Sequence, residues 1–347
     1  MSDDRCGHVA NISGIGDKGS VCCWRSVWRE TDRCIWHTDS TVPAPAYEQN
    51  RPKAGERLDG ANLRQAPLSG SDVLADCSLV DADFTGATLD RADLSETDLR
   101  RATFRDVDAH GTSFRDANLH DAVFVFADLR SADFRGARLY RAGLTDVRLN
   151  LETAFDERPV YEDELSGEPS TDEITERAES ARWVYRELQR LYEENAFSER
   201  AIDYYVREMD LRRRQAWRVR NYLVALKFAG SRWIMRYGTS PWRVVTASIL
   251  LILFCAGLFP LTGGIQEVGA DTAVTYRVED PTETPGGVLL RAFFKSLYFS
   301  VITFATLGYG DIQPVGSWAR AIAGVETMLG SLLMALLVFV LTRSVRF

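Results

Sequence analysis

The sequence predicts a multidomain membrane protein in which a polar, repetitive amino-terminal part precedes two membrane-spanning helices. Three observations lead to this prediction: a five-residue period over residues 58–150, a helical period over residues 171–240, and two apolar runs after Pro241. A chain of 347 residues is long enough for two or three domains. The mean hydropathy of −0.17 indicates that most of the chain is polar, so the apolar runs are local features.

The overall charge is acidic, with a formal net charge of −8 and a pI near 5.2. This balance argues against nucleic-acid binding by the whole chain. Of the 41 basic residues only four are lysines: Lys18, Lys53, Lys227 and Lys295. An acidic surface poor in lysine suits a halophilic prokaryote, although a GC-rich genome produces the same bias.

Cysteine and histidine concentrate in residues 1–40, which begin without the apolar run of a signal peptide, so we expect cytosolic, reduced thiols. Thiolate and imidazole are the usual zinc ligands, and so short a segment would gain order from a metal. We predict a zinc site formed by Cys6, Cys23, Cys34 and His37, with Cys22 and His8 as alternate ligands. The alternative is a loosely ordered tail with incidental cysteines.

Residues 41–57 form a linker rich in proline and alanine, and residues 58–150 then repeat every five residues. One residue is inserted where a new register starts at Leu74, and from there to Leu149 fifteen of sixteen positions at five-residue steps are Leu or Phe. Two residues earlier, ten of the sixteen are Ala. This period fits neither helix nor strand. It predicts a chain that turns a corner in every repeat around a narrow apolar interior.

The unit A-[D/N/T]-L-x-x, as in "TGATLDRADLSETDLRRATF", resembles the pentapeptide-repeat family. The resemblance implies a right-handed quadrilateral β-helix with four repeats per coil, about five coils and a length of about 25 Å. Some members of that family mimic DNA, but the acids and arginines of this segment are mixed. We therefore expect a scaffolding or regulatory surface for an unknown protein or ligand.

Residues 151–170 form an acidic linker, and residues 171–240 contain a helical hairpin that is broken near Asn195. The hairpin ends in a basic juxtamembrane segment in which arginines alternate with aromatic residues, such as Trp217 and Tyr222. Basic and aromatic residues directly before an apolar span are typical of a segment that lies at a membrane surface.

Two membrane spans are predicted, at residues 244–261 and 319–342. Arginines lie before the first and after the second, while the loop between them is acidic, so both termini are expected in the cytoplasm. Residues 288–304 are apolar but too short for a third full span, which predicts a re-entrant helix followed by a loop. Non-helical backbone at membrane depth is allowed only where it lines a water-filled path or is buried in protein.

The loop after residue 304 reads T-x-G-Y-G-D, from Thr306 to Asp311. Backbone carbonyls that all point into a pore replace the water around a potassium ion, and this requires unusual backbone angles at alternate residues. Gly308 and Gly310 adopt φ > 0 without penalty. Thr306 adds a hydroxyl, while Leu307 and Tyr309 would pack behind the loop.

The order of outer helix, pore helix, filter and inner helix resembles the potassium-channel family over residues 241–347. The resemblance implies a selectivity filter at Thr306, Leu307, Gly308, Tyr309, Gly310 and Asp311. It implies a gating-hinge glycine at Gly330, with Gly324 as the rival. One chain has one filter loop, so a homotetramer is implied. Glu326 is an ionisable residue inside a span and therefore a functional candidate.

The sequence thus predicts a K+-selective channel in the plasma membrane and no enzyme, since an acid–base or nucleophile constellation is not evident. A non-selective cation channel is one alternative. A membrane-anchored scaffold with a vestigial pore is the other.

Overall fold

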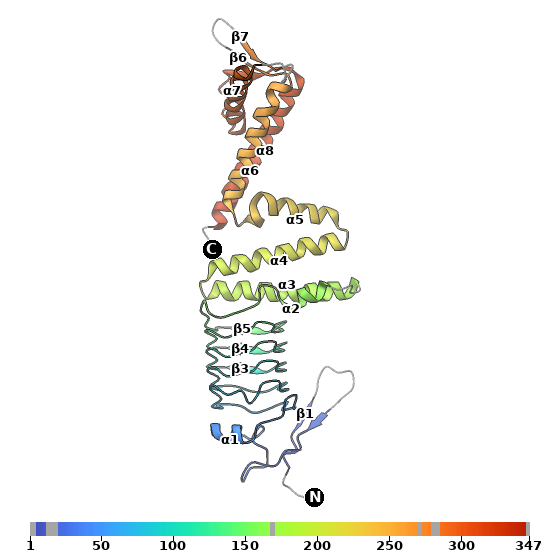
Figure 1. Ribbon diagram of the computed structural model, residues 1–347, viewed down its shortest axis with the longest axis vertical. Helices are drawn as coiled ribbons and strands as arrows, with labels where there is room; N and C mark the ends of the chain where they lie inside the picture. Colours follow the sequence, from blue (N-terminus) through green and yellow to red (C-terminus); the bar gives the residue numbers. More distant parts are fainter. Residues whose placement is uncertain (1–4, 12–19, 167–170, 269–272, 279–284, 345–347) are drawn as a thin grey trace. The chain divides into compact units, whose positions relative to one another are not determined.

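The computed structural model describes residues 5–11, 20–166, 171–268, 273–278 and 285–344 (Figure 1). The chain forms two compact units, residues 1–211 and residues 212–347. Helix α4 (Ser198–Arg218) contains the boundary between them. Each unit is described separately below.

The five-residue repeats of the first unit wind into stacked coils in which equivalent residues pair in parallel (Figure 1). Strands β3 (Thr103–Arg105), β4 (Val123–Val125) and β5 (Gly143–Thr145) pair with partners twenty residues apart, which is four repeats. In the first coil the pairing joins Arg57 to Ser78, a spacing of twenty-one residues. The first coil therefore has one residue more than the later coils, and the extra residue is the one inserted before Leu74.

The interior of the coils is formed by the Leu and Phe positions of the repeat. Phe84, Phe104 and Phe124 stack with ring centroids 4.7 and 4.5 Å apart and are fully buried. Ala109, the exception to the pattern, is also buried. Where Thr112 replaces the small Ala, its hydroxyl donates to the carbonyl of Leu89 at 2.7 Å. The predicted interior is therefore present, and its polar substitutions are hydrogen-bonded.

The corners of the coils have left-handed backbone. Every fifth residue from Asp81 to Asp146 has φ between +52° and +75°, and most of these residues are not glycine. At one corner the amide of Ala82 donates to the carbonyl of Leu79 at 3.1 Å, closing a turn whose third residue is Asp81. Non-glycine residues are uncommon in this region of φ, so the coil-to-coil hydrogen bonds must stabilise these corners.

Both ends of the coil stack are covered. The cover at the amino-terminal end contains β1 (Val9–Asn11), β2 (Ser20–Cys22) and α1 (Ala44–Gln49). It also contains Trp36, which is fully buried. At the other end lie α2 (Val160–Asp163), η1 (Glu164–Ser166) and α3 (Thr171–Glu194). Asn195, after α3, accepts the amide of Leu149 at 3.0 Å, so the helical hairpin packs on the last coil.

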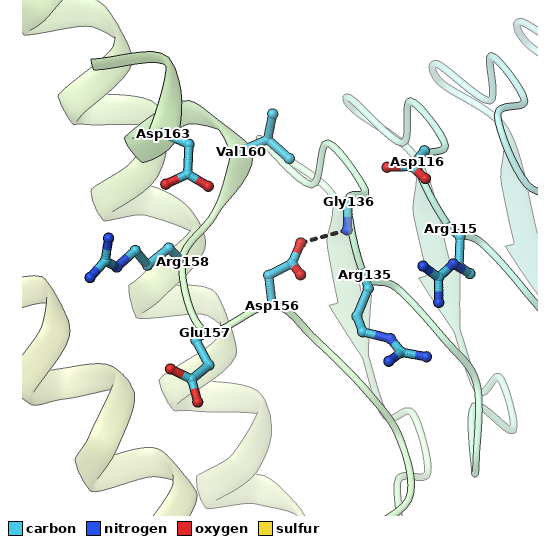
Figure 2. Close-up of a pocket in the computed structure, with 9 residues that line it drawn as sticks. All are labelled: Arg115, Asp116, Arg135, Gly136, Asp156, Glu157, Arg158, Val160 and Asp163. Atoms are coloured by element: carbon cyan, nitrogen blue, oxygen red, sulfur yellow. Dashed lines mark hydrogen bonds between the residues drawn. The ribbon is translucent and has the colours of Figure 1, made fainter. Parts of the chain in front are cut away.

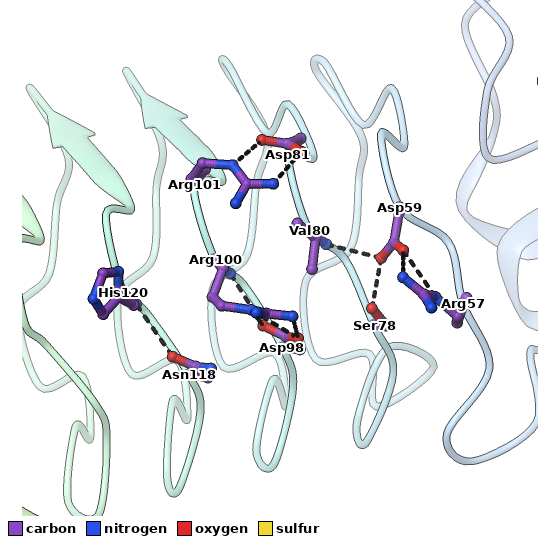
Figure 3. Close-up of polar contacts among 10 residues, drawn as sticks. All are labelled: Arg57, Asp59, Ser78, Val80, Asp81, Asp98, Arg100, Arg101, Asn118 and His120. Atoms are coloured by element: carbon purple, nitrogen blue, oxygen red, sulfur yellow. Dashed lines mark hydrogen bonds and ion pairs between the residues drawn. The ribbon is translucent and has the colours of Figure 1, made fainter. Parts of the chain in front are cut away.

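The outer surface of the coils carries paired charges rather than a field of one sign (Figure 3). Within one repeat, Arg100 binds Asp98 at 2.7 Å, and between coils Arg101 binds Asp81 at 2.6 Å. These pairings hold the pKa of Arg100 and Arg101 above the usual value through their hydrogen bonds to the carboxylates. Such a balanced surface does not have the uniform negative charge of DNA.

In its described residues, the second unit contains the helices α5 to α8 and a small sheet. Helix α5 (Tyr222–Met235) and η2 (Arg236–Gly238) precede α6 (Pro241–Leu258) and η3 (Phe259–Leu261). Strands β6 (Ile265–Val268) and β7 (Ala273–Tyr276) are followed by α7 (Gly286–Phe304), β8 (Ile312–Pro314) and α8 (Gly316–Ser344). The strands form an antiparallel sheet in the order β7-β6-β8.

The described part of the second unit has three helices long and apolar enough to cross a membrane, and α7 is one of them with 19 residues. By length alone, the expectation that residues 288–304 are too short is therefore not met. However, β7 lies before α7 and β8 lies after the following loop, and both strands pair with β6. The strands before and after this helix–loop segment thus belong to one sheet, and the re-entrant course of the segment stays a prediction.

Replacing Phe104 with Ala should destabilise the coils by about 3–5 kcal/mol, because the change opens a cavity between two stacked rings. The matched control is Phe126→Ala, since that side chain is exposed and its removal should change stability by less than about 0.5 kcal/mol. Pulse proteolysis in urea, following a fragment that spans the coils, measures both. Equal effects of the two changes would contradict the assigned interior.

Candidate functional site

The loop between α7 and β8 has an alternating backbone. Thr306, Gly308 and Gly310 have φ of 55°, 53° and 80°, whereas Leu307 and Tyr309 are not in the left-handed region. A β-branched residue such as Thr306 is an outlier at positive φ, and backbone outliers of this kind cluster at functional sites. The side chains of Leu307 and Tyr309 are 53% and 66% exposed in the single chain, so this loop presents an open face.

The start of this loop continues the carboxyl-terminal end of α7. The amide of Thr306 donates to the carbonyl of Thr303 at 3.1 Å, and the amide of Leu307 donates to that of Ile302 at 2.9 Å. Carbonyl groups in the last turn of α7 therefore accept hydrogen bonds from the first amides of the loop. The negative end of the helix dipole also points toward it, which favours a nearby cation.

The far end of the loop is held by a strand and a side chain. Strand β8 follows Asp311 directly, and Ile312 pairs with Glu267 of β6. Tyr298 of α7 donates to the carboxylate of Asp311 at 3.0 Å. Both ends of the loop are therefore fixed to the helix that precedes it and to the sheet.

A second contact that anchors α7 was not predicted from the sequence. Lys295 binds the carboxylate of Glu267 at 2.7 Å, and Tyr276 donates to the same carboxylate at 2.9 Å. The hydrogen bond from Lys295 is the main cause that lowers the pKa of Glu267. The acidic segment between η3 and α7 thus contains a short hairpin, β6–β7. Its strand β6 pairs with β8, which follows the loop of residues 305–311, called the filter-like loop below. The only available signal was the β-branched and aromatic residues in "IQEV" and "AVTY".

Glu326, the acid inside α8, is fully buried and joins three helices. Ser300 of α7 bonds to the Glu326 carboxylate, and the same hydroxyl lies 2.9 Å from the carbonyl of Ile252 in α6. Among the residues the structure describes, the buried Ser296 hydroxyl has no hydrogen-bond partner. This cluster lies between α6, α7 and α8, so its direct effect is on how α7 packs against the other two helices.

The two glycines of α8 that were hinge candidates have different surroundings. A Cβ on Gly330 would lie 2.6 Å from the carbonyl oxygen of Phe304, the last residue of α7. A Cβ on Gly324 would meet nothing within 4 Å. Gly330 therefore allows α8 to approach the end of α7, directly before the filter-like loop. A role of either glycine as a hinge stays a prediction.

A second candidate site lies in the amino-terminal segment of the first unit. The ligand atoms of Cys6, Cys23, Cys34 and His37 all lie within 4.8 Å of one another. The Sγ atoms of Cys23 and Cys34 are 3.7 Å apart, and Nδ1 of His37 lies 3.2 and 3.6 Å from Sγ of Cys34 and Cys6. Ligands about 2.3 Å from a tetrahedral zinc lie about 3.8 Å apart. The four residues therefore fit a zinc ion.

The electrostatics of this cluster also suit a cation. Nε2 of His37 lies 3.2 Å from the carbonyl of Asp59, and a proton on Nε2 leaves Nδ1 free to bind a metal. The hydrogen bond between the two sulfurs is the main cause that lowers the pKa of Cys23 and raises the pKa of Cys34. A dication would stabilise both sulfurs as thiolates.

Of the two alternate zinc ligands, His8 is described by the structure and is not part of this cluster. His8 stacks on His37 with ring centroids 4.1 Å apart, and burial is the main cause that lowers its pKa. Cys22 belongs to β2, and its side chain lies outside the described residues.

A pocket of about 690 Å³ lies beside the last coils and the start of α2 (Figure 2). Arg115, Arg135 and Arg158 line it together with several carboxylates. Arg115 and Arg135 both bind Asp133, and Asp156 accepts the amide of Gly136 at 2.5 Å. Burial is the main cause that raises the pKa of Asp156. The charges at this pocket compensate each other, so we assign it no ligand.

Comparison with protein families gives two matches in separate parts of the chain. Residues 270–346 match the ion channel family, and residues 77–154 match the pentapeptide repeat region. The first range contains α7, the filter-like loop and α8; the second contains most of the coils. No curated protein matches the chain significantly.

Several solved structures resemble the coils. One is the pentapeptide repeat protein Rfr23 of the cyanobacterium Cyanothece, with 28% identity over 29% of this chain and 64% of that chain, and a TM-score of 0.21. HetL of Nostoc, involved in heterocyst differentiation regulation, has 28% identity over 28% and 52%, and a TM-score of 0.18. A pentapeptide repeat protein of the Arabidopsis thaliana thylakoid lumen has 28% identity over 33% and 78%, with 0.19.

This chain therefore spans less than two thirds of the length of the first two proteins. All three TM-scores are below 0.5, so the description of the coils rests on their own register and interior.

Replacing Gly330 with Ala should destabilise the packing of α8 on α7 by about 1–3 kcal/mol, because the new methyl group overlaps the carbonyl of Phe304. The control Gly324→Ala should be neutral or stabilising by up to about 1 kcal/mol, since Ala favours helix and the space is open. Thermal unfolding of the purified protein in detergent compares the two. A Gly330→Ala protein as stable as Gly324→Ala would contradict the packing role.

Proposed function

We propose that this chain is the subunit of a potassium-selective channel and that four copies form the pore. The observation that carries the proposal is the alternating backbone of Thr306, Gly308 and Gly310, followed by Asp311. One chain supplies one such loop, and the open face of the loop suits closure by further copies around a four-fold axis. The match of residues 270–346 to the ion channel family supports the general class.

The mechanism follows from the backbone of the loop. When left-handed residues alternate with residues of ordinary φ, successive peptide units turn so that their carbonyls face one side. Four such loops would offer rings of oxygens that replace the hydration shell of K+. The protein's contribution is to hold these oxygens at a fixed width, which requires support from Asp311, β8 and α7. The carbonyls act as ligands, and passage down the gradient needs no covalent step.

The membrane orientation that we propose places both termini in the cytoplasm and the sheet outside. In α5, Leu223, Leu226 and Trp233 are 85%, 66% and 80% exposed and lie on one face of the helix. An apolar stripe with Lys227 close by suits a helix that rests on the inner surface of the plasma membrane. A basic segment before the first span agrees with this orientation.

The cytoplasmic coils, as a right-handed four-sided β-helix, would serve as a scaffolding or regulatory surface for an unknown protein or ligand. Their paired charges support this role over nucleic-acid binding. We propose no enzymatic activity for the chain. The acidic, lysine-poor composition supports a halophilic prokaryotic source.

We further propose that Cys6, Cys23, Cys34 and His37 bind one Zn²⁺. Three sulfurs and one imidazole nitrogen at tetrahedral spacing support this metal over Mg²⁺ or Ca²⁺, which prefer oxygen. When bound, the ion supplies no reaction chemistry; it cross-links the segment.

The experiment that tests the channel proposal is K+ flux into liposomes that contain the purified protein. Wild-type protein should conduct, and Gly308→Ala should reduce flux by at least about a hundredfold, because a left-handed residue would gain a side chain at the filter. Gly287→Ala is the control, since Gly287 is helical and has open space around it. Wild-type protein without flux, and therefore indistinguishable from Gly308→Ala, would favour the scaffold alternative. A Gly308→Ala protein that conducts as well as a conducting wild type would instead contradict the assigned filter.

A further inference from the structure

The amino-terminal segment and the first coil meet at Asp59. The carbonyl of Asp59 lies 3.2 Å from Nε2 of His37. The carboxylate of the same residue accepts the hydroxyl of Ser78 at 2.5 Å and the amide of Val80 at 3.2 Å, both in the next coil (Figure 3). Asp59 is buried and also pairs with Arg57. One buried residue therefore contacts a candidate metal ligand and two layers of the coil stack.

A second contact joins the same parts of the chain. The amide of Asn62 in the first coil donates to the carbonyl of Trp36 at 2.8 Å. The Trp36 ring is fully buried and lies 5.2 Å from the ring of Tyr47 in α1. In the sequence, Trp36 lies between Cys34 and His37. The backbone amide of His37 donates to the backbone carbonyl of Cys34 at 3.0 Å. The position of the two ligands therefore determines where Trp36 covers the end of the apolar interior.

This cover has little regular structure of its own. Its strands β1 and β2 have three residues each, and α1 has six. So small a segment buries too little apolar surface to order itself and usually requires a metal or disulfides. A stack of repeats also needs a cap, because the outermost coil otherwise exposes unpaired backbone groups and its interior. The order of the cap, and of the first coil that it covers, therefore depends on what holds the cysteines in place.

We propose that a metal ion at Cys6, Cys23, Cys34 and His37 locks this cap onto the first coil, so that metal occupancy controls the order of the amino-terminal end of the β-helix. The ion would join the β1–β2 hairpin, through Cys6 and Cys23, to the Cys34–His37 turn. That turn holds Asn62 through Trp36 and Asp59 through His37. This inference rests on the zinc site proposed above.

Loss of the metal therefore loosens the coil nearest the cap. The amides of Leu58, Gly60 and Asn62 should become less protected, because their hydrogen bonds lie in or beside the layer that the cap covers. The amides of the central coils bond to layers that are themselves covered on both sides, as Ser113 does to Ala92 and Phe114 does to Asp133, and should not change. The effect is thus expected to decay along the stack.

The test is hydrogen exchange of the full-length protein in detergent, measured by mass spectrometry with Zn²⁺ bound and after removal by a chelator. Peptides that contain residues 57–63 should exchange at least about tenfold faster without metal, and peptides from residues 98–140 should exchange equally. Adding Zn²⁺ back should restore the slow exchange. Metal content, measured in the same samples, should be one zinc per chain.

Two variants separate the zinc site from its coupling to the coil. Cys34→Ser should lose the zinc and show the fast exchange even with Zn²⁺ added, whereas Cys77→Ser, a buried cysteine outside the cluster, should retain both zinc and slow exchange. Failure of the wild type to bind zinc, or a mass two daltons lower from a Cys23–Cys34 disulfide, would overturn the metal site. Zinc bound at one per chain without any change in exchange at residues 57–63 would leave the site intact and overturn the coupling.

Discussion

The structure depends most on a backbone held in a conformation that most residues avoid. Thr306 adopts left-handed φ together with Gly308 and Gly310, and a strained loop of this kind persists only when its surroundings determine it. Those surroundings are the end of α7, the pairing of β8 with β6, and the bond from Tyr298 to Asp311. Gly330 and Glu326 support α7 itself. Gly330 allows α8 to approach the end of α7, and Glu326 of α8 bonds to Ser300 of α7, which also contacts α6.

The coils solve a similar problem by repetition. Each corner also contains a left-handed residue, and most corners lack glycine. Here no single contact supports the backbone. Every layer donates amides to the next, as Phe84 does to the carbonyl of Thr103 at 2.8 Å, and the stacked Phe rings fill the interior. The same dependence on neighbours explains why the two ends of the stack need covers, one built from the cysteine-rich segment and one from α3.

Sequence patterns predicted those features that repeat or that need particular residue types. The five-residue period located the buried Leu and Phe positions, and the two glycines of the filter-like loop indicated two of its three left-handed residues. The left-handed backbone of the corners was not predictable, because most corners are occupied by residues other than glycine, chiefly Asp and Arg. The hairpin β6–β7 was missed because four-residue strands in an acidic loop carry little pattern. Choosing between His8 and His37 required three dimensions: both lie near the cysteines, but His8 stacks on His37 and only His37 presents Nδ1 to the sulfurs.

The central claim is that this backbone selects K+ by replacing its water with carbonyl oxygens. Reversal potentials of the reconstituted protein with K+ on one side of the bilayer and Na+ on the other test that claim most directly. We predict that K+ is at least about tenfold more permeant than Na+, which corresponds to a difference of about 1.4 kcal/mol between the two ions. A reversal potential near zero, with a measurable current, would contradict the claim and indicate a non-selective cation channel.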